Sequence, residues 1–240
     1  MQAQSTELSR GDIGVLLRGE PGPIQTWSER WNWRRLALHV GVILFGAGLY
    51  GAAMGWWRDP QQALYTAIKF PLIILLTTIG NALLNAMLAP LLGLNAPFRQ
   101  SFLSILMSFT IASAIFGAFA PLAAFLVWNA PPLSADARIS STTYSVILVA
   151  HVAVIAFAGV AANFRLLQLL EKLAGKRPVA RRVLLAWMAG NLFLGSQLSW
   201  IFRPFFGSPG LPIQFLREHP LQGNFYESVF RAALNLLHSH

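Results

Sequence analysis

The sequence predicts an all-α protein: a polytopic membrane bundle of five transmembrane helices followed by a C-terminal amphipathic surface helix. The chain of 240 residues is 55% hydrophobic and only 11% charged, which lies outside the range of ordinary soluble domains. Long apolar runs without charged residues flank the basic stretch 164–183, and about 20 such residues suffice to cross a hydrocarbon core. The basic stretch holds a single acid, Glu171, which is typical of a loop that stays in the cytoplasm.

Residues 1–35 form a polar segment that is expected on the cytoplasmic side. Thr26 and Glu29 have the spacing of a capping box, which predicts that a helix begins near Trp27. Aromatic and basic side chains are then expected to anchor this helix at the membrane surface: Trp27, Arg30, Trp31, Trp33, Arg34 and Arg35.

Residues 36–202 form the predicted transmembrane domain. Its five spans are the apolar stretches 36–57, 70–92, 101–128, 144–164 and 183–202. None of these stretches contains Asp, Glu, Lys or Arg, which disfavours ion-coupled transport and charged selectivity rings.

Gly51 and Gly55 in the first span are four residues apart, a spacing that lets a neighbouring helix approach closely. The neighbour is either another helix of this chain or the same helix of a second copy. Pro121 in the long third span predicts a tilt or a bend.

Polar side chains share helix faces in the second and third spans. Thr78, Asn81 and Asn85 lie on one face of the second span, and Ser104 and Ser108 lie on one face of the third. Amides in hydrocarbon need hydrogen-bond partners, so these faces are expected to point into the bundle as interhelical contacts. The alternative is that they line a polar path.

His39 and His151 are the titratable groups of the predicted spans, and two histidines on different spans could in principle ligate one haem iron. At 1.5 Å per residue they lie about 5 Å and about 20 Å from the cytoplasmic edge, which is too different for a shared iron. Each is therefore expected to be a hydrogen-bonded structural histidine. The sequence contains no Cys, which excludes disulfides and thiolate metal sites, and no cofactor is expected.

Residues 203–240 form a predicted extracytoplasmic tail. Its first half is rich in proline, and its second half reads as an amphipathic helix capped by Asn224 and Glu227. The apolar stripe of this helix is expected to lie on the membrane surface or to dock on a partner. The docking residues are Phe225, Tyr226, Val229, Phe230 and Leu237.

Basic residues are more numerous in the loops assigned to the cytoplasm than in those on the opposite side. This asymmetry predicts a multi-pass protein of the cell inner membrane, with the N-terminus in the cytoplasm and the C-terminus outside. The basic residues sit in short loops beside apolar runs, so no nucleic-acid partner is expected.

The run Lys69–Thr78, together with Gly93, Arg99 and the pair Ala120–Pro121, resembles the membrane core of bacterial Yip-family proteins. The resemblance implies five spans, a cytosolic N-terminus, an outward C-terminus and a non-enzymatic membrane protein.

The sequence contains no phosphate loop, nucleophile elbow, HExxH motif or paired carboxylates. The function predicted is therefore that of a non-catalytic accessory or scaffold subunit of a membrane assembly. Its partners would be membrane lipids and other membrane subunits or further copies of itself. Two alternatives remain: a protein that conducts small molecules or lipids, and a redox subunit that binds haem or quinone.

Overall fold

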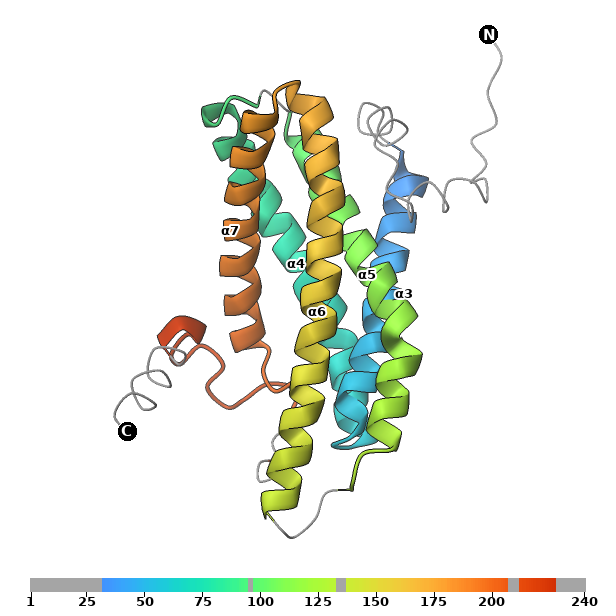
Figure 1. Ribbon diagram of the computed structural model, residues 1–240. Coiled ribbons are helices and arrows are strands. Elements are labelled where there is room, and N and C mark those ends of the chain that lie inside the picture. The colour runs from blue at the N-terminus through green and yellow to red at the C-terminus, as the bar shows by residue number, and fades with distance from the viewer. Residues whose placement is uncertain (1–31, 95–96, 133–136, 207–211, 228–240) are drawn as a thin grey trace, which may run out of the picture.

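The computed structural model describes residues 32–94, 97–132, 137–206 and 212–227, with only the backbone for 137–142. Within these ranges five long helices are present and no strand: α3 (Trp33–Trp56), α4 (Pro60–Leu91), α5 (Phe98–Trp128), α6 (Ala137–Ala174) and α7 (Arg177–Ile201). Successive helices run in opposite directions along one bundle axis (Figure 1). The expected all-α bundle is thus present in the described part of the chain.

Helix α4 runs obliquely through the bundle and connects its two sides. It packs against α3 along its first half and against α7 along its second half (Figure 1). Helix α5 packs between α3 and α6, and α6 also contacts α7.

Four helical segments are long and apolar enough to cross a membrane: α3, α4, α5 and residues 143–174 of α6. Their length and composition fit a membrane protein. Helix α7 is not among them, because Asn191, Ser196 and Gln197 interrupt its apolar run.

Capping residues, and not hydropathy, decide where α3 and α4 begin. Helix α3 starts at Trp33, because Asn32 is its N-cap and accepts a hydrogen bond from the Arg34 amide at 2.9 Å. The proposed capping box at 26–29 lies outside the described residues. Helix α4 starts at Pro60, well before the predicted start at residue 70, because Asp59 caps it and accepts a hydrogen bond from the Gln61 amide at 2.7 Å.

The early start of α4 corrects the assignment of Lys69. Hydropathy places this residue in a loop outside the spans, whereas it lies inside α4 and its side chain is fully buried. Helix α4 is a candidate membrane span and contains Lys69, so the expectation that no charged residue lies within a span is wrong for α4.

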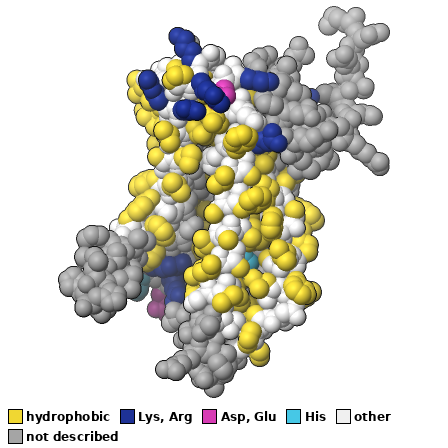
Figure 2. Space-filling model, viewed as in Figure 1, with side chains coloured by type: hydrophobic (Ala, Val, Ile, Leu, Met, Phe, Trp, Pro, Cys, Tyr) yellow, Lys and Arg dark blue, Asp and Glu magenta, His cyan; other side chains and the backbone are white. Residues whose placement is uncertain are grey.

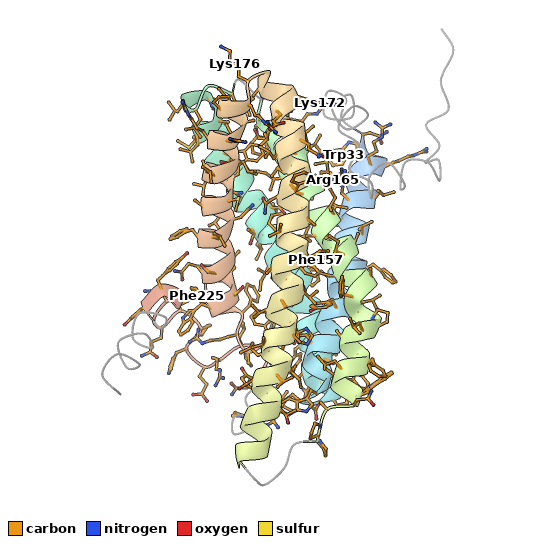
Figure 3. The ribbon with its side chains drawn as sticks, in the orientation of Figure 1. Trp33, Phe157, Arg165, Lys172, Lys176 and Phe225 are labelled. Atoms are coloured by element: carbon orange, nitrogen blue, oxygen red, sulfur yellow. The ribbon has the colours of Figure 1, made fainter. Side chains whose placement is uncertain are left out.

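The basic stretch 164–183 is mostly helical and not a loop. Helix α6 continues to Ala174, Gly175 makes the turn with a positive φ of 63°, and α7 begins at Arg177. The Arg177 guanidinium forms an ion pair with Glu171 at 2.7 Å across this turn. Lys and Arg side chains gather at this end of the bundle (Figure 2), where Figure 3 labels Arg165, Lys172 and Lys176.

Three glycines of α3, Gly46, Gly51 and Gly55, lie in close contact with neighbouring helices of the chain. A Cβ at Gly51 or Gly55 would collide with the α4 backbone at Thr66 or Gln62, and a Cβ at Gly46 would collide with the α5 backbone at Ser113. Of the two neighbours considered for the Gly51–Gly55 pair, the structure therefore has the one inside the same chain.

Candidate functional site

Three buried polar side chains of α4 hold the chain segment that follows α7. Gln62, Thr66 and Lys69 lie on one face of α4. Lys69 Nζ donates to the Pro204 carbonyl at 2.9 Å, and Gln62 Nε2 donates to the same oxygen at 3.0 Å and to the Phe205 carbonyl at 2.8 Å. The Thr66 hydroxyl is hydrogen-bonded to the Phe205 carbonyl at 2.7 Å.

These hydrogen bonds explain how a non-helical segment fits against the bundle. Non-helical backbone at membrane depth is tolerated only where protein or water satisfies its polar groups. Residues 203–206 leave the helical path after α7, and the side chains of α4 satisfy the carbonyls of Pro204 and Phe205. We call this segment the 203–206 strap.

No described carboxylate lies within ion-pair distance of Lys69. Aromatic rings surround its ammonium instead: the Phe215 centroid lies at 4.9 Å, that of Tyr65 at 5.8 Å and that of Phe205 at 6.0 Å. The Pro204 carbonyl and the aromatic rings thus take the place of a counter-ion around this buried cation.

Arg203 fixes the start of the strap. Its guanidinium stacks on the Trp200 ring at 3.8 Å and donates to the Trp200 carbonyl at 2.6 Å, next to the cis peptide bond between Arg203 and Pro204. Burial and the nearby charge of Arg217 lower the pKa of Arg203.

A second buried polar centre joins α3 to α6. The Tyr50 hydroxyl and His151 Nδ1 are hydrogen-bonded at 2.8 Å, and their rings meet edge to face with centroids 5.2 Å apart. Phe116 stacks on Tyr50 at 5.3 Å, and Phe206 of the strap packs on His151 at 5.2 Å. His151 is 1% exposed, and its Nε2 has no hydrogen-bond partner among the described residues.

A cavity of about 600 Å³ lies next to this centre, between α5 and the first part of α6. Its wall is largely apolar, with Tyr50, Asn129, Thr143 and His151 as the side chains with polar atoms. Sequence reasoning missed this cavity, because the Tyr50–His151 pairing spans 101 positions of sequence.

His39 lies in a separate place. Its Nδ1 is 2.9 Å from the Thr110 hydroxyl, which itself donates to the Leu106 carbonyl at 2.8 Å, so the imidazole is the donor in this bond. Along α3, His39 and the Tyr50 partner of His151 are about 16 Å apart at 1.5 Å per residue. The two histidines therefore do not converge on one site, and the described residues contain no cluster of three potential metal ligands.

The amide pair of the second predicted span connects α4 to α7. Asn81 Nδ2 donates to the Trp187 carbonyl at 3.1 Å and to Asn191 Oδ1 at 2.6 Å, while Asn85 Nδ2 donates to Asn81 Oδ1 at 2.8 Å. Gly190 makes this contact possible, because a Cβ there would collide with Asn81 Oδ1.

The hydroxyls of the predicted polar faces make a different kind of bond. Thr78 donates to the Ile74 carbonyl at 2.7 Å and Ser104 to the Gln100 carbonyl at 2.7 Å, each within its own helix. Ser108 is buried as well.

The tail returns to α7. Asn224 Oδ1 accepts the Glu227 amide at 2.8 Å and residues 225–227 are helical. Tyr226 stacks on Phe193 with centroids 6.0 Å apart, and its hydroxyl is 2.9 Å from that of Ser196. Phe225 is partly exposed beside α7 (Figure 3). The other expected docking residues lie outside the described part of the chain: Val229, Phe230 and Leu237.

No protein family, curated protein or solved structure matches this chain. The resemblance to Yip-family proteins stays a prediction from the sequence. The structure itself therefore offers three features that bear on function: the strap held by Lys69, the cavity beside His151, and the α4–α7 contact centred on Asn81.

Proposed function

We propose that this chain is a non-catalytic integral membrane protein that serves as a subunit of a larger membrane assembly. In this proposal α7 is the fifth span, and the turn between α6 and α7 faces the cytoplasm together with the N-terminal segment. Residues beyond the 203–206 strap lie on the other side of the inner membrane. The Lys and Arg side chains at the α6–α7 end of the bundle support this orientation (Figure 2).

The outer half of α7 is the observation that carries the proposal. The last buried residue of α7 is Trp187, and from 188 to 201 every side chain is at least partly exposed. Contact with lipid is favourable for the apolar side chains of Leu192 and Phe193, which are 68% and 55% exposed. Lipid does not suit the amides of Asn191 and Gln197 on the same half-helix.

Gln197 makes this point most directly, because no described residue forms a hydrogen bond with it. A side-chain amide within a membrane gains about 0.6 kcal/mol on average from an interhelical hydrogen bond. A helix of a second membrane-protein chain, packed against α7, would supply that bond and cover the half-helix. The occupant is therefore another subunit or a second copy of this chain.

The size of the natively extracted complex tests the proposal. Protein extracted directly from membranes into lipid nanodiscs should have a mass larger than one chain plus lipid. Gln197→Leu should lower the yield of that larger species without shifting the midpoint of thermal unfolding. Gln168→Leu on α6 is the matched control and should leave the yield unchanged, because Gln168 lies at the basic end beside Arg165. A purely monomeric unmodified protein would contradict the proposal.

A protein that handles lipids or small molecules is the second candidate, and the cavity beside His151 favours it. The amide donors of Asn81 and Asn85 are used within α4 and toward α7, which does not favour conduction along that face. Binding of a membrane-dissolved molecule is the form of this candidate that the geometry supports.

A further inference from the structure

The end of the bundle at which α6 meets α7 carries positive charge that no described residue neutralises. The one acid of the stretch 164–183, Glu171, is paired with Arg177 at 2.7 Å. The neighbouring cations are exposed and have no ion-pair partner among the described residues: Lys172, Lys176, Arg181 and Arg182. Like charges gathered at one end of a bundle repel one another, so an anion that binds beside them would be stabilised.

Two of these cations lie on the outward face of α7. Arg181 and Arg182 stand between Ala180 and Val183, whose side chains are fully buried. With about 3.6 residues per turn, a helix that turns residues 180 and 183 toward the bundle turns residues 181 and 182 away from it. Leu185, which is 65% exposed, lies one turn further along the same face. The outward face of α7 thus changes from basic to apolar within one turn.

Helix α6 has the same order of exposed side chains. Val160 and Phe164 are 71% and 60% exposed, and the exposed Arg165 follows directly. Hydrophobic side chains cover the surface that adjoins the Lys and Arg side chains (Figure 2). In a bilayer the lipid phosphates lie directly outside the hydrocarbon core. An exposed apolar surface that ends in exposed cations therefore marks where acyl chains give way to phosphates.

A phospholipid matches both parts of this surface in one molecule. Its phosphate accepts two parallel hydrogen bonds from a guanidinium, and its acyl chains begin close to that phosphate. An acidic soluble protein would pair with the cations but would leave the adjoining Leu185 without an apolar partner. A zwitterionic headgroup carries its own ammonium, which the same cations repel, so the excess of positive charge selects a lipid with net negative charge.

We propose that the basic end of α7 is a binding site for an anionic phospholipid. Arg181 and Arg182 hold the phosphate, and Leu185 contacts the first part of an acyl chain. Lys172 and Lys176 add attraction at longer range. The site requires α7 to lie in the membrane, as proposed above, but it does not require a second chain on the outer half of α7. A monomeric protein would therefore contradict the assembly role and leave this site intact.

Native mass spectrometry of the full-length protein in detergent, titrated with single phospholipids, tests the proposal. Phosphatidylglycerol, which is anionic, should bind more tightly than phosphatidylcholine, which is zwitterionic. Arg181→Gln combined with Arg182→Gln should weaken the binding of phosphatidylglycerol about ten- to thirtyfold, because each basic residue near a lipid surface contributes about fivefold. Leu185→Gln should weaken it about two- to fivefold, because an apolar contact with the acyl chain is lost.

Arg34→Gln combined with Arg35→Gln is the matched control. It removes the same charge from α3, at the same end of the bundle but outside the proposed site (Figure 1). The affinity for phosphatidylglycerol should be nearly unchanged in this variant. Arg181, Arg182 and Leu185 are exposed, so their replacement should not shift the midpoint of thermal unfolding. This measurement separates a lost site from a lost fold.

Equal affinities for the two lipids, or an equal loss in the control variant, would overturn the site and leave only non-specific attraction to a charged surface. Displacement of the lipid by inorganic phosphate, together with unchanged lipid binding by the Leu185→Gln protein, would assign the two arginines to a free phosphate ion. A polyglutamate peptide that binds Arg181 and Arg182 more tightly than phosphatidylglycerol does would assign this face to an acidic protein instead.

Discussion

Asn81→Leu should weaken the packing of α7 against α4, and the structure sets the size of the effect. Leu has nearly the shape of Asn but removes the two bonds that reach Trp187 and Asn191 on α7. Interhelical hydrogen bonds in membranes average about 0.6 kcal/mol and reach about 1.7 kcal/mol. The two bonds together give an expected loss of about 1–3 kcal/mol in the free energy of unfolding.

Unfolding in mixed micelles by added dodecyl sulfate, followed by tryptophan fluorescence, measures this loss. Trp187 is fully buried at the α4–α7 contact and is one of eight tryptophans, so the signal follows unfolding of the whole bundle, in which exposure of Trp187 contributes. Asn163→Leu is the matched control, because Asn163 Nδ2 donates only within α6, to the Gly159 carbonyl at 2.8 Å. The control should lose less than about 0.5 kcal/mol.

The refuting results follow from the same contact. An Asn81→Leu protein with the unfolding midpoint of the unmodified protein would show that these bonds contribute nothing. Gly190→Ala gives an independent check, because its Cβ collides with Asn81 Oδ1 and nothing else so closely. The loss of unfolding free energy that Gly190→Ala causes should largely vanish when Asn81 is also replaced by Ala. An equal loss with and without Asn81→Ala would also refute the contact.

The remaining predictions concern packing, the strap and topology. Gly46→Ala should cost about 1–3 kcal/mol of unfolding free energy, because its Cβ meets the rigid backbone of α5. Gly41→Ala has open space around it and should cost nothing by the same micelle titration. Thr66→Val removes a hydroxyl bonded to the strap and should speed maleimide labelling of a cysteine placed at the half-buried Phe205, whose backbone carbonyl the substitution keeps, a clean readout in a chain without Cys. Labelling at the unmodified rate would contradict a role of Thr66 in holding the strap. A green fluorescent protein inserted after Gly175 should fluoresce, and an alkaline phosphatase inserted after Gly223 should be active outside the cytoplasm. The opposite pattern would overturn the proposed orientation.

Hydropathy locates the interiors of the helices but not all of their ends. It assigns the stretch 60–69 to a loop because Gln61, Gln62 and Lys69 are polar, whereas this stretch forms the first part of α4. The start signal is present in the sequence as Asp59 followed by proline. A polar residue inside a membrane helix is indistinguishable from a loop residue until its partner is known.

The contacts of the candidate sites can also be predicted only in part from the sequence. The four-residue spacing of Asn81 and Asn85 is enough to place both amides on one helix face, yet nothing in that spacing identifies α7 as the partner. The acceptor of Lys69 lies 135 positions away along the chain, at Pro204. Local patterns cannot predict such a pair, because every residue type carries a backbone carbonyl.

That this chain forms apolar helices long enough to span a membrane is predictable from its sequence alone, since a shortage of charge and the length of the apolar runs are local properties with one physical solution in lipid. Which buried groups meet depends on the tertiary fold: Lys69 with the strap, Tyr50 with His151, and the glycines of α3 with the backbones of α4 and α5. These pairings result from many weak packing contacts between the helices acting together, and no single stretch of sequence encodes them.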